Sequence, residues 1–80
     1  MKTITHAVAD RISKCIGKIS EYQLSILSGV PYSTIKSIMQ RKTKSVDLKT
    51  IILLADGLGI KPSEFIDDDS FLAKNLNLLK

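Results

Sequence analysis

Residues 20–40 read SEYQLSILSGVPYSTIKSIMQ, and this stretch predicts two short helices joined by a tight turn. Ser20 is a candidate N-cap for the first helix, and Gln23 stands three residues later in the capping-box position. The helix is expected to end at Gly29, because glycine commonly terminates helices. Its buried side is expected to carry Leu24 and Leu27. The first helix therefore spans only about two turns.

The second helix of the pair has an apolar face and a polar face. It is expected to start after Val30 and to run to about Gln40. Pro31 is tolerated in a first helical turn, because its missing N–H would have no intrahelical partner there. At about 100° per residue, the apolar side chains that share one face are Ile35, Ile38 and Met39. The opposite face carries Ser33, Lys36, Ser37 and Gln40, with Tyr32 at its edge. This polar face has no acid, and its hydroxyls, amide and cation suit base edges and phosphates in a DNA major groove.

Apolar residues at helical spacing predict further helices on both sides of this pair. Between about Thr5 and Lys18, the residues on one helical face are Val8, Ile12, Cys15, Ile16 and Ile19. Beyond the pair, residues 41–45 contain no apolar side chain and are expected to form a basic loop. Asp47 then caps a helix that ends around Gly57 to Gly59. Its inward side chains are expected to be Leu48, Ile51, Ile52, Leu54, Ala55 and Leu58.

Two shorter elements are expected towards the end of the chain. Pro62 opens a fifth helix in which Phe65 and Ile66 are buried. The stretch 67–70 is acidic and suits a helix N-terminus. The apolar residues at approximate helical spacing after it are Phe71, Leu72, Leu76 and Leu79. No strand-like alternation with turn signals occurs, so the expected fold is an all-α bundle of five helices, or six if the last stretch is helical.

The order of these features resembles one known family. The residues that carry the resemblance are Gln23-Leu24, Ser28-Gly29-Val30, Ser33-Thr34-Ile35, Leu48 with Ile52, the run LADGLGI at 54–60, and Ser63-Glu64-Phe65-Ile66. Over residues 7–68 the chain resembles the phage-repressor and Cro-like helix-turn-helix family, also called the XRE family. The resemblance implies a five-helix domain of the lambda-repressor-like type. In such domains the second helix of the pair enters the major groove and the first crosses the backbone.

The resemblance also implies roles for individual side chains. Base contacts are expected from Tyr32, Ser33, Lys36 and Ser37. Phosphate contacts are expected around Ser20, Glu21, Pro31 and Gln40 and from the loop residues Arg41, Lys42 and Lys44. Two placements of Tyr32 stay open: its ring packs back on the preceding helix with the hydroxyl toward DNA, or it contacts a thymine methyl group.

Three positions depart from the family pattern. Glu21 stands where the family often has Gln, and its charge is unfavourable near phosphate unless it turns away or pairs with a cation. Ser25 replaces a common Ala and is expected to bond back to a carbonyl of its own helix. Gln40-Arg41 replaces an Asn-Gly pair, and Arg lacks the ease of glycine in a left-handed conformation. We therefore expect either a longer helix or a loop that takes another path.

Charge is distributed unevenly along the 80 residues. Residues 1–49 carry nine Lys or Arg against three acids, a balance of +6. Residues 50–80 carry three Lys against five acids, a balance of −2. This asymmetry favours a face that binds a polyanion in the first part of the chain, although an ordinary solvated surface has a similar composition.

Length and composition exclude several classes of function. A chain of 80 residues is about one small domain, which excludes a bilobal enzyme. The single cysteine, Cys15, and single histidine, His6, cannot supply a disulfide or a four-ligand zinc site. Cys15 is expected in the core and His6 at the surface or at a helix cap. The acids 67–69 match no calcium loop, and no nucleophile elbow or phosphate-binding loop is present, so no enzyme, cofactor or metal is expected.

These features together predict a sequence-specific transcriptional regulator that binds double-stranded DNA. We expect a homodimeric repressor on a palindromic operator. We expect the protein in the cytoplasm, because the longest apolar run is far too short to span a bilayer. Residues 1–69 are expected to form the DNA-binding domain. Residues 70–80 are expected to form an apolar extension that docks on the same core or makes the dimer. The alternative is an antitoxin-like or adaptor subunit that binds a protein partner through this extension and the acidic region 64–69.

Overall fold

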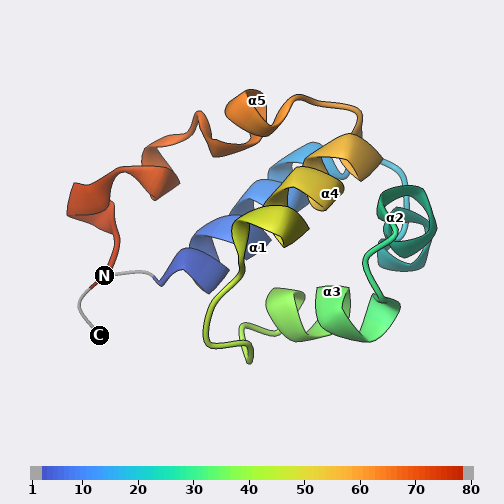
Figure 1. Cartoon of the computed structure of the whole chain (residues 1–80), viewed down its shortest axis with the longest axis horizontal. Helices are drawn as coiled ribbons and strands as arrows, with labels where there is room; N and C mark the ends of the chain where they lie inside the picture. The colour runs from blue at the N-terminus through green and yellow to red at the C-terminus, as the bar shows by residue number, and fades with distance from the viewer. Residues whose placement is uncertain (1–2, 79–80) are drawn as a thin grey trace.

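The computed structural model describes residues 3–78, and its regular elements are helices (Figure 1). The α-helices are α1 (Ile4–Cys15), α2 (Glu21–Ser28), α3 (Tyr32–Met39), α4 (Leu48–Leu58) and α5 (Pro62–Ile66). Two 3-10 turns follow, η1 (Asp69–Phe71) and η2 (Ala73–Asn75). Helix α2 packs on α3 and α4, α1 packs on α3, and α5 packs on α4. The predicted all-α fold with its tightly joined helix pair is confirmed.

The sixth helix that the spacing of residues 71–79 favoured is replaced by η1 and η2. Leu72 stands between them in an extended conformation, with φ −71° and ψ 137°, and interrupts the helical path. The Asp68 carboxylate accepts from the Ser70 N–H at 3.0 Å, and Asn75 Nδ2 donates to the Asp69 carbonyl at 2.7 Å. The Asn75 side chain thus occupies the Asp69 carbonyl, which a continued α-helix would pair with a backbone N–H. Leu79, which was assigned to the same helix, lies outside the described residues.

The predicted starts of α2 and α4 are confirmed by their caps. The Gln23 N–H donates to Ser20 Oγ at 3.0 Å, and the Ser20 N–H donates to Gln23 Oε1 at 2.9 Å, which completes the capping box. Asp47 accepts from the Thr50 N–H at 2.9 Å at the start of α4. Hydrogen bonding from Thr50 lowers the pKa of Asp47 from its ordinary value. Gly29 ends α2 in the left-handed conformation, with φ 79°.

The core is mostly aliphatic. Its fully buried large apolar side chains are Val8, Ile12, Leu24, Ile35, Ile38, Leu54 and Phe65. Cys15, which was predicted in the core, is half-buried, because it is the last residue of α1. His6 is half-buried, and its Nδ1 lies 2.7 Å from Oγ1 of Thr3, the N-cap of α1. The expectation of a histidine near a helix cap is thus confirmed.

Four side chains that were predicted to be buried are instead exposed. These are Leu27, Leu48, Ile52 and Ile66. A helix buries one stripe of its surface, and Leu48 and Ile52 lie one turn apart beside the buried stripe of α4. Leu27 points away because α2 turns Leu24 and Ser28 inward. Helical spacing predicted which residues share a face but not how wide the contacted stripe would be.

Helices α2 and α4 approach each other closely at Gly57. A Cβ atom at this position would lie 2.7 Å from Ser28 Cβ and 2.9 Å from both Cα and N of Ser28. The predicted end of this helix, around Gly57 to Gly59, is confirmed: α4 continues through Gly57 to Leu58, and Gly59 is its C-cap with φ 76°. Gly57 therefore does not terminate the helix, and it supplies the space in which Ser28 sits.

Two cations of α1, Arg11 and Lys14, hold α5 and the segment that follows it. The Arg11 guanidinium donates to the carbonyls of Phe65 and Glu64, both at 2.7 Å. Asp68 forms an ion pair with Lys14 at 3.0 Å and lies 3.9 Å from Arg11. Hydrogen bonds from Ser70, together with the neighbouring Lys14, hold the pKa of Asp68 well below its ordinary value. The path of the chain beyond α5 is thus set by polar contacts with α1.

Apolar contacts also hold part of this segment to the core. The Phe71 ring lies 6.1 Å from the Phe65 ring, measured between centroids, and Leu76 is buried. Leu72 and Leu78 are exposed. Side chains at 71 and 76 thus dock on the same domain, whereas those at 72 and 78 face outward. In Figure 1 the segment runs from α5 back toward the start of α1.

Gly57→Ala is expected to destabilise the fold by about 1–3 kcal/mol, as overpacking of a close contact does. At an unobstructed interior position of a helix, the same change would stabilise by roughly 1 kcal/mol. Urea unfolding followed by far-UV circular dichroism measures the difference. Asp56→Ala, at the exposed neighbouring position of α4, is the matched control. A Gly57→Ala protein as stable as the wild type would contradict the close approach of α2 and α4.

Candidate nucleic-acid interface

Helix α3 presents the predicted polar face at the surface. Ile35 and Ile38 are buried against the core, and Met39 is half-buried. On the other side Ser33, Lys36 and Gln40 are exposed and Ser37 is half-buried. No acid lies on this helix. The division of α3 into an apolar and a polar face is therefore confirmed.

The ring of Tyr32 packs back on α2, which is the ring position of the first predicted placement, and a contact of its hydroxyl with DNA stays a prediction. Its centroid lies 5.9 Å from that of Tyr22, with the ring planes at 73°. The Lys36 Nζ lies 5.8 Å from the Tyr32 centroid. Tyr22 was not predicted as a site residue. The sequence feature that could have indicated it is an aromatic residue outside the buried stripe of α2, where its side chain is exposed. Tyr22, Tyr32 and Lys36 thus form one continuous surface at the helix pair.

The C-terminal end of α3 uses a left-handed arginine. Arg41 has φ 59°, its N–H donates to the Ile38 carbonyl, and the Lys42 N–H donates to the Ser37 carbonyl, both at 2.9 Å. This pattern is the Schellman motif, in which glycine is usual at the left-handed position. The predicted alternative of a longer helix is wrong, because α3 ends at Met39 with Gln40 as its C-cap. Arg41 adopts the left-handed conformation in spite of its side chain.

Side-chain contacts explain how Arg41 holds this conformation. Its guanidinium donates to the Met39 carbonyl at 2.8 Å and to Asp10 Oδ1 on α1 at 2.7 Å. The loop is also fastened at Thr43, whose carbonyl accepts from Thr5 Oγ1 at 2.9 Å. Lys42 and Lys44 are exposed and, within residues 3–78, form no ion pair. Of the three cations predicted at phosphates, Arg41 is therefore engaged with α1, whereas both lysines extend into solvent.

The remaining predicted phosphate residues lie near the ends of α2 and α3. Ser20 Oγ is used as the α2 cap, and Gln40 is the exposed C-cap of α3. Glu21 is half-buried in the first turn of α2, where a negative charge suits the helix dipole. Ser25 Oγ donates to the Tyr22 carbonyl at 2.6 Å, which confirms the expected bond within its own helix.

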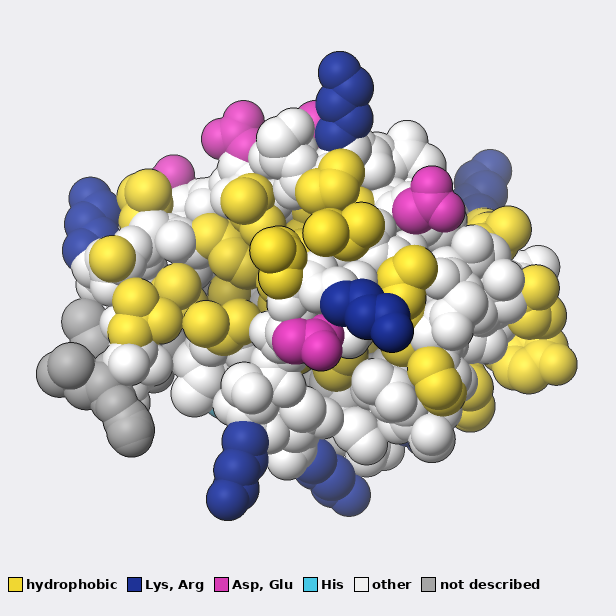
Figure 2. Space-filling view, viewed as in Figure 1, with side chains coloured by type: hydrophobic (Ala, Val, Ile, Leu, Met, Phe, Trp, Pro, Cys, Tyr) yellow, Lys and Arg dark blue, Asp and Glu magenta, His cyan; other side chains and the backbone are white. Residues whose placement is uncertain are grey.

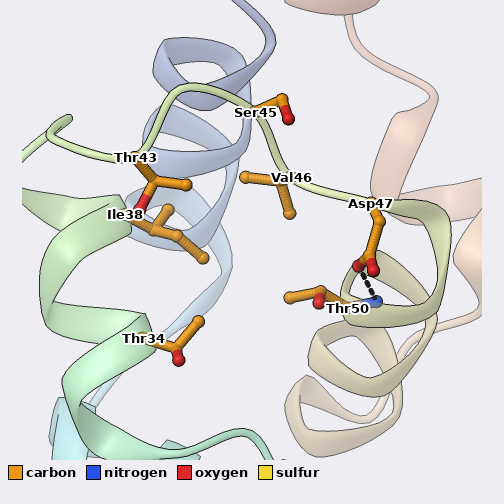
Figure 3. A pocket seen from close by; sticks show the side chains of 7 residues that line it. All are labelled: Thr34, Ile38, Thr43, Ser45, Val46, Asp47 and Thr50. Carbon is orange, nitrogen blue, oxygen red and sulfur yellow. Dashed lines mark hydrogen bonds between the residues drawn. The ribbon is translucent and has the colours of Figure 1, made fainter.

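A hollow of about 260 Å³ lies between α3 and the start of α4 (Figure 3). Its lining residues are Thr34, Ile38, Thr43, Ser45, Val46, Asp47 and Thr50. Hydroxyl groups dominate, but the charged group here is the Asp47 carboxylate, which bonds to the Thr50 N–H. A carboxylate repels phosphate. The outer face of α3 and the two loop lysines are therefore a better polyanion-binding surface than this hollow.

The two sides of the molecule differ in charge. Figure 2 shows Lys and Arg side chains projecting at the lower edge, which α3 and the following loop occupy, and acidic side chains along the upper edge near α5, where a cation also projects. Lys36 lies on α3, and Lys42 and Lys44 lie in the loop after it, whereas Glu64 lies in α5 and Asp67 and Asp69 follow that helix. The cations of α3 and its loop thus lie beside the polar face of α3, and the acids near α5 are accompanied by Lys61, the N-cap of that helix.

A short helix, a tight glycine turn and a second helix with an exposed polar face define a helix-turn-helix DNA-binding protein. The family model of the Cro/C1-type HTH DNA-binding domain matches residues 17–69, and the chain belongs to this family. Comparison with curated proteins gives no match, and neither does comparison with solved structures. Membership makes the protein a DNA-binding regulator of a non-enzymatic family, with DNA as its partner.

Within residues 3–78, no group of three or more His, Cys, Asp or Glu side chains is placed to hold a metal ion. None of the helices in that range has the length and apolar character needed to cross a membrane.

Arg41→Gly is expected to give a more stable protein than Arg41→Ala, by about 1 kcal/mol, because a non-glycine residue in the left-handed conformation costs roughly 1–2 kcal/mol. Both variants lose the same contacts with Asp10 and Met39. Urea unfolding of the two proteins measures the difference. An Arg41→Ala protein at least as stable as Arg41→Gly would show that residue 41 is not left-handed in solution.

Proposed function

We propose that this protein is a sequence-specific transcriptional regulator that binds double-stranded DNA and represses transcription by occupying its operator. The observation that carries the proposal is the exposed, acid-free face of α3 beside two free loop lysines in a Cro/C1-type domain. A helix with such a face fits the major groove, where hydroxyls, amides and cations can pair with base edges. A regulator of this kind works where the DNA is, so we assign it to the cytoplasm.

We assign base contacts to Tyr32, Ser33, Lys36 and Ser37. Residues near the N-terminus of a recognition helix reach base edges, and Tyr32 and Ser33 open α3. Lys36 carries the cation of this face, and a lysine can donate to guanine O6 and N7. Ser37 is half-buried, so its contact would come from the hydroxyl alone.

We assign phosphate contacts to Ser20, Gln40, Lys42 and Lys44. We assign a further phosphate contact to Arg41, for whose guanidinium DNA would compete with Asp10. Contacts to phosphate position a protein on DNA without reading sequence. Lys42 and Lys44 need no rearrangement, because both are exposed. Arg41 would have to leave Asp10, and its guanidinium in the free protein holds the loop against α1.

We further propose that two copies of the chain bind together, with residues 1–69 as the DNA-binding domain and the tail as part of the dimer contact. An apolar groove of about 450 Å³ is lined by Ile4, Val46, Leu48, Ile51, Ile66, Phe71, Leu76 and Leu78. Several of these side chains are exposed, and Figure 2 shows hydrophobic side chains gathered toward the C-terminal segment. A second copy on this surface would bury them and present two copies of α3 to an inverted repeat whose half-sites lie about 34 Å apart.

The second candidate function is that of an antitoxin-like or adaptor subunit. A separate apolar surface on α2 favours it: Ile26 and Leu27 are exposed and line a hollow of about 290 Å³ together with Ile19 and Gln23. Contiguous exposed apolar groups often mark protein-binding surfaces. A protein partner docked there would need α2, whereas the base-reading face of α3 would be dispensable.

Selection of bound duplexes from a random pool at moderate salt is expected to enrich an inverted repeat. Lys36→Glu is expected to lower affinity for the selected site by about a hundredfold or more, since a base contact worth ~1–3 kcal/mol is lost and an anion is placed beside phosphates. Lys61→Glu, an equal charge change before α5, is the matched control and should bind nearly as the wild type does. Enrichment of no sequence by a folded protein would overturn the proposed function and favour the adaptor.

Replacing Lys42 and Lys44 together by Ala is expected to lower the slope of log affinity against log salt by roughly two units, because each phosphate contact contributes about 0.9. Affinity should fall about equally for the selected site and for unrelated duplexes. The control replaces Lys61 and Lys74, which lie before α5 and in η2, and should leave the slope near the wild-type value. An unaltered slope in the loop variant would remove the loop from the phosphate contacts.

A further inference from the structure

Tyr22 is a large side chain without a place in the core. It stands in the first turn of α2 and is 60 % exposed. The hydrophobic core and the side chains packed against it do not include Tyr22. Its ring contacts the ring of Tyr32, the first residue of α3. Core packing therefore does not explain an aromatic side chain at this position, and its ring contact points toward α3.

The contact continues from Tyr32 to Lys36. The edge-to-face angle of 73° between the two tyrosine rings is one that aromatic pairs prefer. The Lys36 Nζ lies over the Tyr32 ring, 5.8 Å from its centroid, within the range of a cation–π contact. Tyr22 thus limits the orientations of the Tyr32 ring, and that ring in turn limits the positions of the Lys36 ammonium group.

We infer that Tyr22 is a positioning residue that sets the base preference of this regulator by holding Tyr32 and, through it, Lys36. The inference rests on the proposed function, since it names a residue that determines specificity at the same site. A lysine is a flexible point charge that can pair with a base or with either neighbouring phosphate. Holding its ammonium group over one ring favours one of these partners. Tyr22 is uncharged, so non-specific affinity, which phosphate neutralisation dominates, does not depend on it.

A direct phosphate contact through the Tyr22 hydroxyl predicts something different. Such a contact would be lost in Tyr22→Phe, and affinity would fall for all duplexes alike. The positioning role needs the ring and not the hydroxyl. Tyr22→Phe is therefore expected to behave as the wild type, whereas Tyr22→Leu is expected to lose specificity.

The first experiment uses the full chain without DNA. Ring currents of Tyr32 are expected to shift the Lys36 side-chain methylene resonances upfield in the wild-type protein, and Tyr32→Leu measures the full loss of this shift. Tyr22→Leu is expected to lose at least about half of it, and Tyr22→Phe to retain it. An unchanged Lys36 shift in Tyr22→Leu, or no change even in Tyr32→Leu, overturns the inference. Unfolding curves confirm that each variant is folded.

The second experiment compares affinity for the selected site with affinity for an unrelated duplex. Tyr22→Leu is expected to lower this ratio about three- to tenfold, as loss of an aromatic and a cation–π contact would, with non-specific affinity unchanged. Equal loss for both duplexes would indicate a phosphate or purely structural role and overturn the inference. Absence of any sequence preference in the wild-type protein overturns the proposed function and with it the specificity role. An unchanged Lys36 shift without DNA overturns this inference alone.

Discussion

The close approach of α2 to α4 at Gly57 is the contact on which the placement of α3 depends. Helices α2 and α3 are eight residues each, too short to be stable alone in water. Ser28 fills the space above Gly57, and its Oγ accepts from the Val30 N–H at 3.1 Å in the turn that leads to α3. One contact thus joins α4 to α2, to the turn and to the start of α3. A side chain at 57 would push this assembly apart.

The other end of α3 is fixed by a different kind of interaction. Arg41 accepts an unfavourable backbone conformation, and its hydrogen bonds to Met39 and Asp10 offset part of that cost. Thr5 holds the next stretch of the loop through the Thr43 carbonyl. With Val30 buried at one end and Arg41 bonded to Asp10 at the other, α3 is held at both ends where it packs on α1 and α2. A rigid scaffold of this kind lets a short polar helix face be presented in one orientation.

Charge and apolar surface are segregated in the same molecule. The cations beside α3 face one way, and the acids of α5 and the following segment face the other, where Asp68 is held by Lys14 and Arg11. This distribution favours the α3 side for contact with a polyanion. The exposed apolar side chains lie near the tail and on α2, where they line two separate hollows.

Features that arise within a few residues of each other could be predicted from the sequence: helices α1 to α5, the capping box at Ser20, the cap at Asp47 and the two faces of α3. Each depends on local hydrogen bonds or on helical periodicity, so neighbouring residues suffice to predict it. The tertiary structure alone decided the Tyr22–Tyr32 contact, the role of Gly57, the ion pair of Arg41 with Asp10, and the exposure of Leu27 and Leu48. These depend on how closely segments distant in sequence approach and on which stripe of each helix they cover, and local patterns carry no record of either.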